Sequence, residues 1–238
     1  MANTSKVNPT PPTPSSANQD VPNRGSVYGE QFVYPIGHGR VHLADEGSYF
    51  VATNPTPGTG IATIAALSAF AATSPFFMLV NTSTTKKVYL DFIQLGVTVV
   101  GTSAASLSHL LVIDNGIGRY TSGGSSLTPK NVNMLSDTVS LCSVYCGALV
   151  AGAASGLVRQ LGGGSFRPAA PQVGDSYTVT FGCPESNFGQ IVTDAIIRVV
   201  VNHSPVVVGP QQTFLYYIWL ASQSAASNFE IEAGWWER

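Results

Sequence analysis

The chain has 238 residues, of which 44% are hydrophobic, so it is long enough to bury a sizeable core in one large domain or two small ones. Only 10% of the residues are charged, against about 25% in an ordinary soluble domain. The net charge is −2 and no basic block occurs, which argues against binding nucleic acid through its phosphates. A surface this poor in charge favours a chain that is largely covered in a stable assembly.

Residues 1–26 are rich in Pro, Ser, Thr and Asn and contain no aromatic residue. They lack the apolar segment of a secretory signal, so we expect neither export by the general route nor a core of their own. The composition predicts an extended, polyproline-like arm. Either it is a disordered tail or it orders against a neighbouring subunit. In the second case the expected contact residues are Val7, Pro11, Pro12, Pro14 and Val21.

The next two segments differ in character. The stretch 37–47, GHGRVHLADEG, holds the densest group of titratable residues and is interpreted as a polar hairpin or an interface segment. On a strand its His38 and His42 lie about 13 Å apart, too far for a shared metal ion. The Ala-rich stretch 60–73 has Ile61, Ile64 and Leu67 near helical spacing and predicts one short helix.

Strand-like runs follow one another through the rest of the chain, separated by clusters of Gly, Pro, Asn and Ser. Eight or more such runs predict an all-β fold, an antiparallel β-sandwich or jelly roll, as a single domain over residues 27–238. The expected strand regions are 47–53, 74–100 with a turn at 82–86, 106–116, 131–150, 175–182, 189–208, 213–222 and 228–236.

The stretch 140–164, SLCSVYCGALVAGAASGLVRQLGGG, invites several interpretations. Its lack of charge does not indicate a membrane span, because the absence of charge is general in this chain. Residues 47–85 are uncharged as well, and they contain three prolines. Cys142 and Cys146 are about 13 Å apart on a strand and are expected to be free, buried core residues, and Cys183 is expected to be free as well. The glycines 162–164 lack the Lys of a phosphate loop and are interpreted as a flexible connection.

No pattern in the sequence indicates catalysis. There is no nucleophile elbow and no paired-carboxylate motif, and no His, Cys or Asp cluster has metal-ligand spacing. We therefore expect no enzyme activity, no catalytic residue, no cofactor and no metal.

Aromatic residues gather near the C-terminus. In the run 213–222 both faces are apolar, which predicts a strand covered on both sides by core packing or, on one side, by a subunit contact. Trp235 and Trp236 stand where a free terminus usually frays, so we expect an exposed pair that contacts a partner or forms a sugar platform. Tyr120 and Tyr145 are further candidates for stacking on sugars.

Two segments resemble virion structural proteins of tailed, podovirus-like bacteriophages: GRYTSGGSSLTPKNVN at 118–133 and LVNTSTTKKVYLDFIQL at 79–95. The similarity extends in style over residues 30–235 and implies a β-sandwich cement or decoration protein. Such a protein is made in the host cytoplasm, binds the outer capsid surface, and stabilises joints between major capsid subunits. The implied partners are the major capsid protein and other copies of the chain, with neither nucleic acid nor membrane. The alternative is a carbohydrate- or receptor-binding β-sandwich module of a phage fibre or adhesin.

Overall fold

The computed structural model describes residues 39–238 except 66, 155, 183–190 and 194–195. The chain divides into two units, residues 1–42 and 43–238, and the second unit holds the β structure. Within the described residues there is one short helix, α1 (Gly39–Asp45), and the other elements are strands. The predicted all-β class with at most one short helix is therefore confirmed. The expected arm, with Val7, Pro11, Pro12, Pro14 and Val21, lies outside the described residues.

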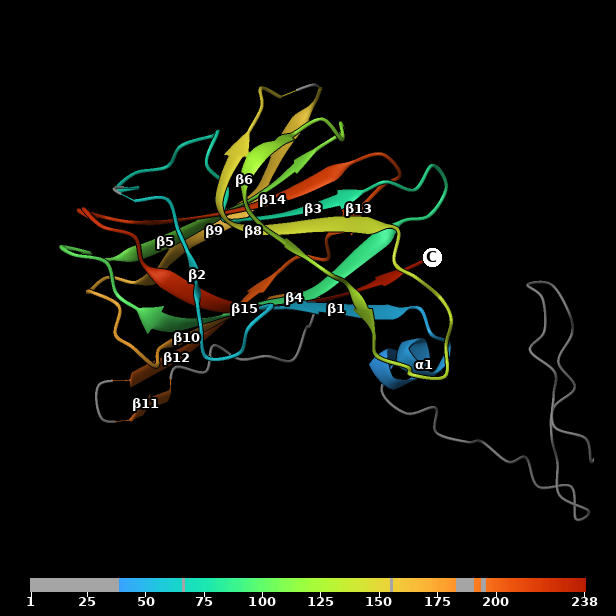
Figure 1. Ribbon diagram of the computed structural model, residues 1–238, viewed down its shortest axis with the longest axis horizontal. Helices are drawn as coiled ribbons and strands as arrows, with labels where there is room; N and C mark the ends of the chain where they lie inside the picture. The colour runs from blue at the N-terminus through green and yellow to red at the C-terminus, as the bar shows by residue number, and fades with distance from the viewer. Residues whose placement is uncertain (1–38, 66, 155, 183–190, 194–195) are drawn as a thin grey trace, which may run out of the picture. The chain divides into compact units, whose positions relative to one another are not determined.

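The strands form two sheets that pack face to face as a β-sandwich, seen as two layers in Figure 1. The first sheet has the order β11 (Ile191–Thr193), β12 (Ile196–His203), β10 (Ser176–Phe181), β4 (Val88–Val99), β15 (Asn228–Glu237), β1 (Tyr49–Thr53) and β7 (Lys130–Asn131), with β13 (Val207–Val208) beside β4 and β2 (Ile61–Ala62) beside β15. The second has the order β6 (Tyr120–Leu127), β8 (Cys142–Ala151), β3 (Phe77–Asn81), β14 (Thr213–Leu220), β5 (Leu107–Asp114) and β9 (Val158–Arg167).

The strand pairing is that of a jelly roll. Along the chain, the eight strands β1, β3, β4, β5, β9, β10, β14 and β15 pair first with last, second with seventh, third with sixth and fourth with fifth. The β4–β15 and β5–β14 pairings then join these ladders into the two sheets. This is a long hairpin wrapped around itself, the arrangement of two Greek keys. The hairpin β6–β8 extends one sheet beyond β3, and β12 runs parallel to β10 to extend the other.

The main core fills the space between the sheets. Strand alternation sends one side chain in two inward, so β14 contributes Phe214, Tyr216 and Ile218 to this core. Leu215 and Tyr217 point to the opposite face and join a smaller apolar cluster there. Both faces of β14 are thus covered, as its sequence predicts, and the outer cover comes from the chain itself.

The buried amide of Asn81 ties the turn between β3 and β4 to the rest of the fold. Its Nδ2 donates to the carbonyls of Lys86, Val208 and Gly209, and its Oδ1 accepts from the Ser83 amide. One side chain thereby bonds to four backbone groups, which helps to satisfy polar groups of the turn and of the segment around β13. The predicted strand, turn and strand over 74–100 are confirmed.

Two local predictions are wrong. Residues 60–73 form no helix in their described part; Ile61 and Ala62 pair with β15, and the segment that follows crosses the outer face of β14. The helix lies instead at Gly39–Asp45, within the stretch interpreted as a polar hairpin or an interface segment, so the hairpin interpretation is wrong. It ends because Gly47 takes a left-handed conformation (φ 70°), and the amides of Gly47 and Ser48 bond to the carbonyls of Ala44 and Leu43.

Candidate functional site

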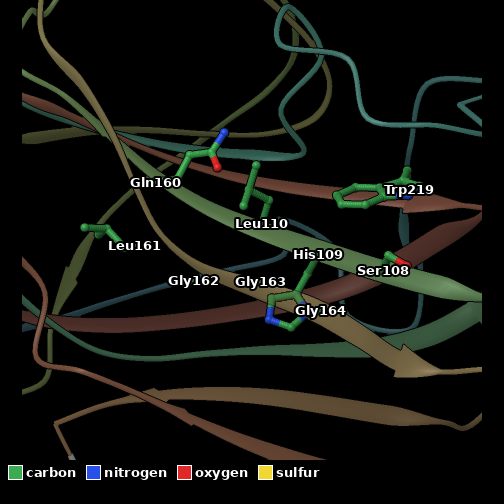
Figure 2. A pocket seen from close by; sticks show the side chains of 9 residues that line it. All are labelled: Ser108, His109, Leu110, Gln160, Leu161, Gly162, Gly163, Gly164 and Trp219. Atoms are coloured by element: carbon green, nitrogen blue, oxygen red, sulfur yellow. The ribbon is translucent and has the colours of Figure 1, made fainter.

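A groove of about 580 Å³ lies over β5, β9 and the end of β14. Its side chains are Ser108 and Leu110 from β5, Gln160 and Leu161 from β9, and Trp219 from β14, and residues 162–164 form its floor. Figure 2 shows Leu110, Gln160 and Trp219 on one side of β5, with the His109 ring on the other side. We call this the outer groove. It faces away from the main core because Leu110 and Trp219 alternate with inward-facing residues.

The strand register explains how the outer groove is built. Trp219 lies opposite Ser108, which lies opposite Ser165, while Leu110 lies opposite Gly163. The register between β5 and β9 shifts between Leu111 and Val112, so Leu161 is an extra residue in β9. Such bulges bend a strand and redirect its side chains. Here the bulge lies at the end of the groove where Gln160 and Leu161 are exposed.

The three glycines of β9 are part of an ordered strand, which corrects their interpretation as a flexible connection. A Cβ on Gly162 would lie 2.6 Å from the His203 ring, and one on Gly163 would lie 2.6 Å from the His109 carbonyl oxygen. A larger residue would force the His203 ring to move at position 162 and the β5 backbone to move at position 163. The run lets β9 approach both its neighbour strand and the histidine beneath it.

An aromatic cluster holds one wall of the groove. The Phe70 ring packs edge-on against Tyr217 at 5.1 Å and against Trp219 at 5.9 Å. The Tyr217 hydroxyl donates to the Ala72 carbonyl at 2.9 Å, which fixes the covering segment to the sheet. The half-buried Trp219 indole is therefore held in place before any ligand arrives.

Beneath the groove two histidines meet between the sheets. The Nε2 atoms of His109 on β5 and His203 on β12 are 3.1 Å apart, and His109 is 2% exposed and stacks on Phe166. Since two protonated nitrogens repel, this contact requires one ring nitrogen to donate and the other to accept. Burial and the neighbouring His203 lower the pKa of His109 to about 4, and burial also lowers the pKa of His203.

A second exposed feature is the loop of residues 132–141 between β7 and β8, which we call the apolar loop. Its tip residues Met134 and Leu135 are 95% and 96% exposed, and Val139 is 78% exposed. The loop is nevertheless held firmly. Asn133 accepts a bond from the Leu135 amide and donates to the Asp45 carbonyl, and Asn131 donates to the carbonyls of Gly47 and Thr138.

The terminal tryptophans have different environments. Trp235 is fully buried, its ring stacks near Phe50, and its indole nitrogen donates to Glu237 Oε1 at 3.1 Å. The expectation of an exposed pair is therefore wrong for Trp235, because strand alternation in β15 points it into the core. Trp236 points outward, is half-buried, and stacks on Tyr89 at 5.5 Å. Its contact with a partner stays a prediction.

Other residues singled out by the sequence are accounted for as follows. Tyr120 and Tyr145 stack on each other, with ring centroids 3.8 Å apart, so one face of each ring is already used. Cys142 and Cys146 are free and buried on β8, as expected, and burial raises the pKa of both thiols. Cys183 lies outside the described residues.

Within the described residues no three His, Cys, Asp or Glu side chains gather as a metal site would require. No helix in that part of the chain is long and apolar enough to cross a membrane. Comparisons of the chain with known protein families, curated proteins and solved structures found no match.

Sequence reasoning missed both the outer groove and the apolar loop. The run 131–150 was expected to be strand, so Met134 and Leu135 were not treated as surface residues. A glycine run within a strand is a usable signal for close approach of backbone or ligand. A glycine cluster with Pro168 four residues further on is also typical of a loop, so the local sequence does not distinguish the two.

Proposed function

We propose that the chain is a structural virion protein of the cement or decoration type. In this proposal it binds the outer surface of a phage capsid, contacts the major capsid protein and other copies of itself, and stabilises joints between capsid subunits. The observation that carries the proposal is the apolar loop, which presents Met134 and Leu135 almost fully exposed at its tip.

Exposed apolar side chains on a firmly held loop support a protein contact. Single exposed apolar residues are common, but an ordered group of them indicates an interaction surface. The hydrogen bonds of Asn131 and Asn133 already fix the loop, so little conformational entropy remains to be lost on binding. Burying Met134 or Leu135 against a partner then contributes about 1.5–3 kcal/mol each.

The composition supports permanent assembly. With 10% charged residues, the chain has few groups that keep an isolated monomer soluble. A jelly roll is a rigid platform of two sheets, and its loops project partner-binding residues without changing the core. Because a shell presents many equivalent joints, contacts that are individually modest become effectively irreversible when a homo-oligomer binds several at once.

The proposal is tested on heads that lack the chain, prepared from the virus whose genome encodes it. Purified protein is added back, and electron microscopy counts the copies bound per head. We expect many copies at symmetric positions. The double variant Met134→Ser and Leu135→Ser should lose most of this binding. Val173→Ser, which removes another exposed apolar side chain (61% exposed), is the matched control and should bind normally.

The proposal fails if native particles carry the chain in a few copies on the tail. It also fails if the double variant decorates heads as fully as the control. Circular dichroism of the double variant and of the control shows whether the fold is intact. We expect it to be intact because Met134, Leu135 and Val173 are all exposed and contribute nothing to the core.

A further inference from the structure

We propose that the outer groove is a binding site for a short, neutral saccharide. This inference concerns another surface than the apolar loop and does not depend on the capsid proposal. It also uses other residues than the aromatic side chains that the sequence suggested for sugar stacking.

The lining of the groove matches the chemistry of a sugar. None of its described lining residues is charged. Gln160 supplies an amide with both donors and an acceptor, and Ser108 supplies a hydroxyl, which are the neutral groups that pair with sugar hydroxyls. Trp219 supplies an apolar ring, on which the C–H face of a pyranose can pack. Neutral lining disfavours phosphate, nucleotide or acidic peptide, which require cationic partners.

The edge position of β9 adds backbone partners. Among the described strands β9 is last in its sheet and pairs with β5 alone. Every second residue of an edge strand directs its N–H and C=O away from the sheet. Because residues 162–164 lack side chains, a ligand can reach the backbone there directly.

The spacing of the polar and aromatic groups sets the size of the ligand. Trp219 and Ser108 lie in one register row, and Val112 and Gln160 lie in another. Four residues along β5 separate these rows, which is about 13 Å at the rise of a strand. A single sugar ring cannot contact both ends, so the geometry fits an oligosaccharide with its apolar end at Trp219 and a hydroxyl-rich end at Gln160.

The site is organised in advance. Phe70 packs against the indole of Trp219, and the pairing of β5 with β9 fixes the backbone of residues 162–164. The bulge at Leu161 bends β9 at the end of the groove. The outer groove also differs in charge from a groove on the first sheet. That groove has Arg198 and Glu230 in its lining, whereas none of the described residues that line the outer groove is charged. Binding to the outer groove should therefore depend little on salt concentration, since no ionic contact is made.

The experiment uses the full chain and saturation-transfer NMR with defined probes. These are maltotriose, cellotriose, mannotriose and the N-acetylglucosamine trimer, with trigalacturonate as an acidic probe and a peptide of residues 5–16 as a proline-rich probe. We expect saturable binding of at least one neutral trisaccharide. Trp219→Ala should weaken it about tenfold, as expected for loss of one aromatic contact.

Controls separate binding from folding. Gln160 is exposed, so Gln160→Ala should keep the fold and still weaken the binding. Gln172→Ala, at another exposed glutamine, is the matched control for Gln160→Ala. Trp236→Ala, at another half-buried tryptophan, is the control for Trp219→Ala. Both should bind like the unmodified chain. The proposal is overturned if no neutral trisaccharide binds, if only the acidic or the peptide probe binds, or if Gln160→Ala and Gln172→Ala behave alike.

Discussion

The paired histidines between the sheets predict that the fold loses stability in mild acid. In the folded protein the pKa of His109 is about 4, because the ring is buried and faces His203. In the unfolded chain the pKa returns to the ordinary 6.5. Between these two values the unfolded state binds more protons than the folded state, so the free energy of unfolding falls as the pH falls.

The size of the effect follows from the shift. A difference of about 2.5 pKa units corresponds to a change of about 3 kcal/mol in the free energy of unfolding. The folded protein has this stability in full above pH 6.5 and has lost all of it below pH 4. That is a large share of the stability of an ordinary domain. His203, whose pKa is lowered by burial, adds to the loss in the same direction.

The assay is urea unfolding of the full chain at a series of pH values between 7 and 4.5. His109→Gln is the comparison, because an amide keeps a hydrogen bond to His203 but never takes up a proton here. Carboxylates titrate in both proteins and cancel in the difference. We expect the unmodified chain to lose about 2–3 kcal/mol more than the variant over this range. Parallel curves for the two proteins would show that the histidine contact is not what makes folding sensitive to acid.

Three further predictions test other parts of the molecule. Cys142 and Cys146 should resist alkylation in the folded chain and react without reductant once it is denatured; rapid labelling of the native protein would contradict their burial. Asp175 accepts hydrogen bonds from the side chains of Arg167 and Tyr177 and from the backbone amides of Gln172 and Ile197. Asp175→Ala should therefore lower the free energy of unfolding by about 3–5 kcal/mol, measured by thermal or urea unfolding. A loss no larger than that of Asp137→Ala, at an exposed aspartate, would refute this. Deleting residues 2–24, which include Val7, Pro11, Pro12, Pro14 and Val21, should leave the β-sandwich folded and weaken capsid attachment; unchanged binding to heads would make the arm a passive tail.

The sequence alone determined the fold class and most strand regions. Period-2 alternation locates β10, and apolar runs bounded by turn residues locate β14 and the β3–β4 pair, because these signals depend only on neighbouring residues. The low charge content likewise follows from the composition, and the two apolar faces of β14 follow from its local sequence. The limit of such signals shows at residues 60–73, where helical spacing of apolar residues was overruled by pairing with β15 and by packing of Phe70 on Trp219.

Only the tertiary structure decided which residues meet. His109 and His203 are 94 residues apart, and nothing in either local sequence indicates that their rings touch. The same holds for Gly162 and Gly163, where a side chain would clash with His203 and with β5. The tertiary structure also decides that Trp235 lies in the core and Trp236 at the surface. The physical reason is that the jelly roll pairs strands far apart in the chain, such as β5 with β14, so the outer groove is assembled from segments whose proximity is fixed by long-range register.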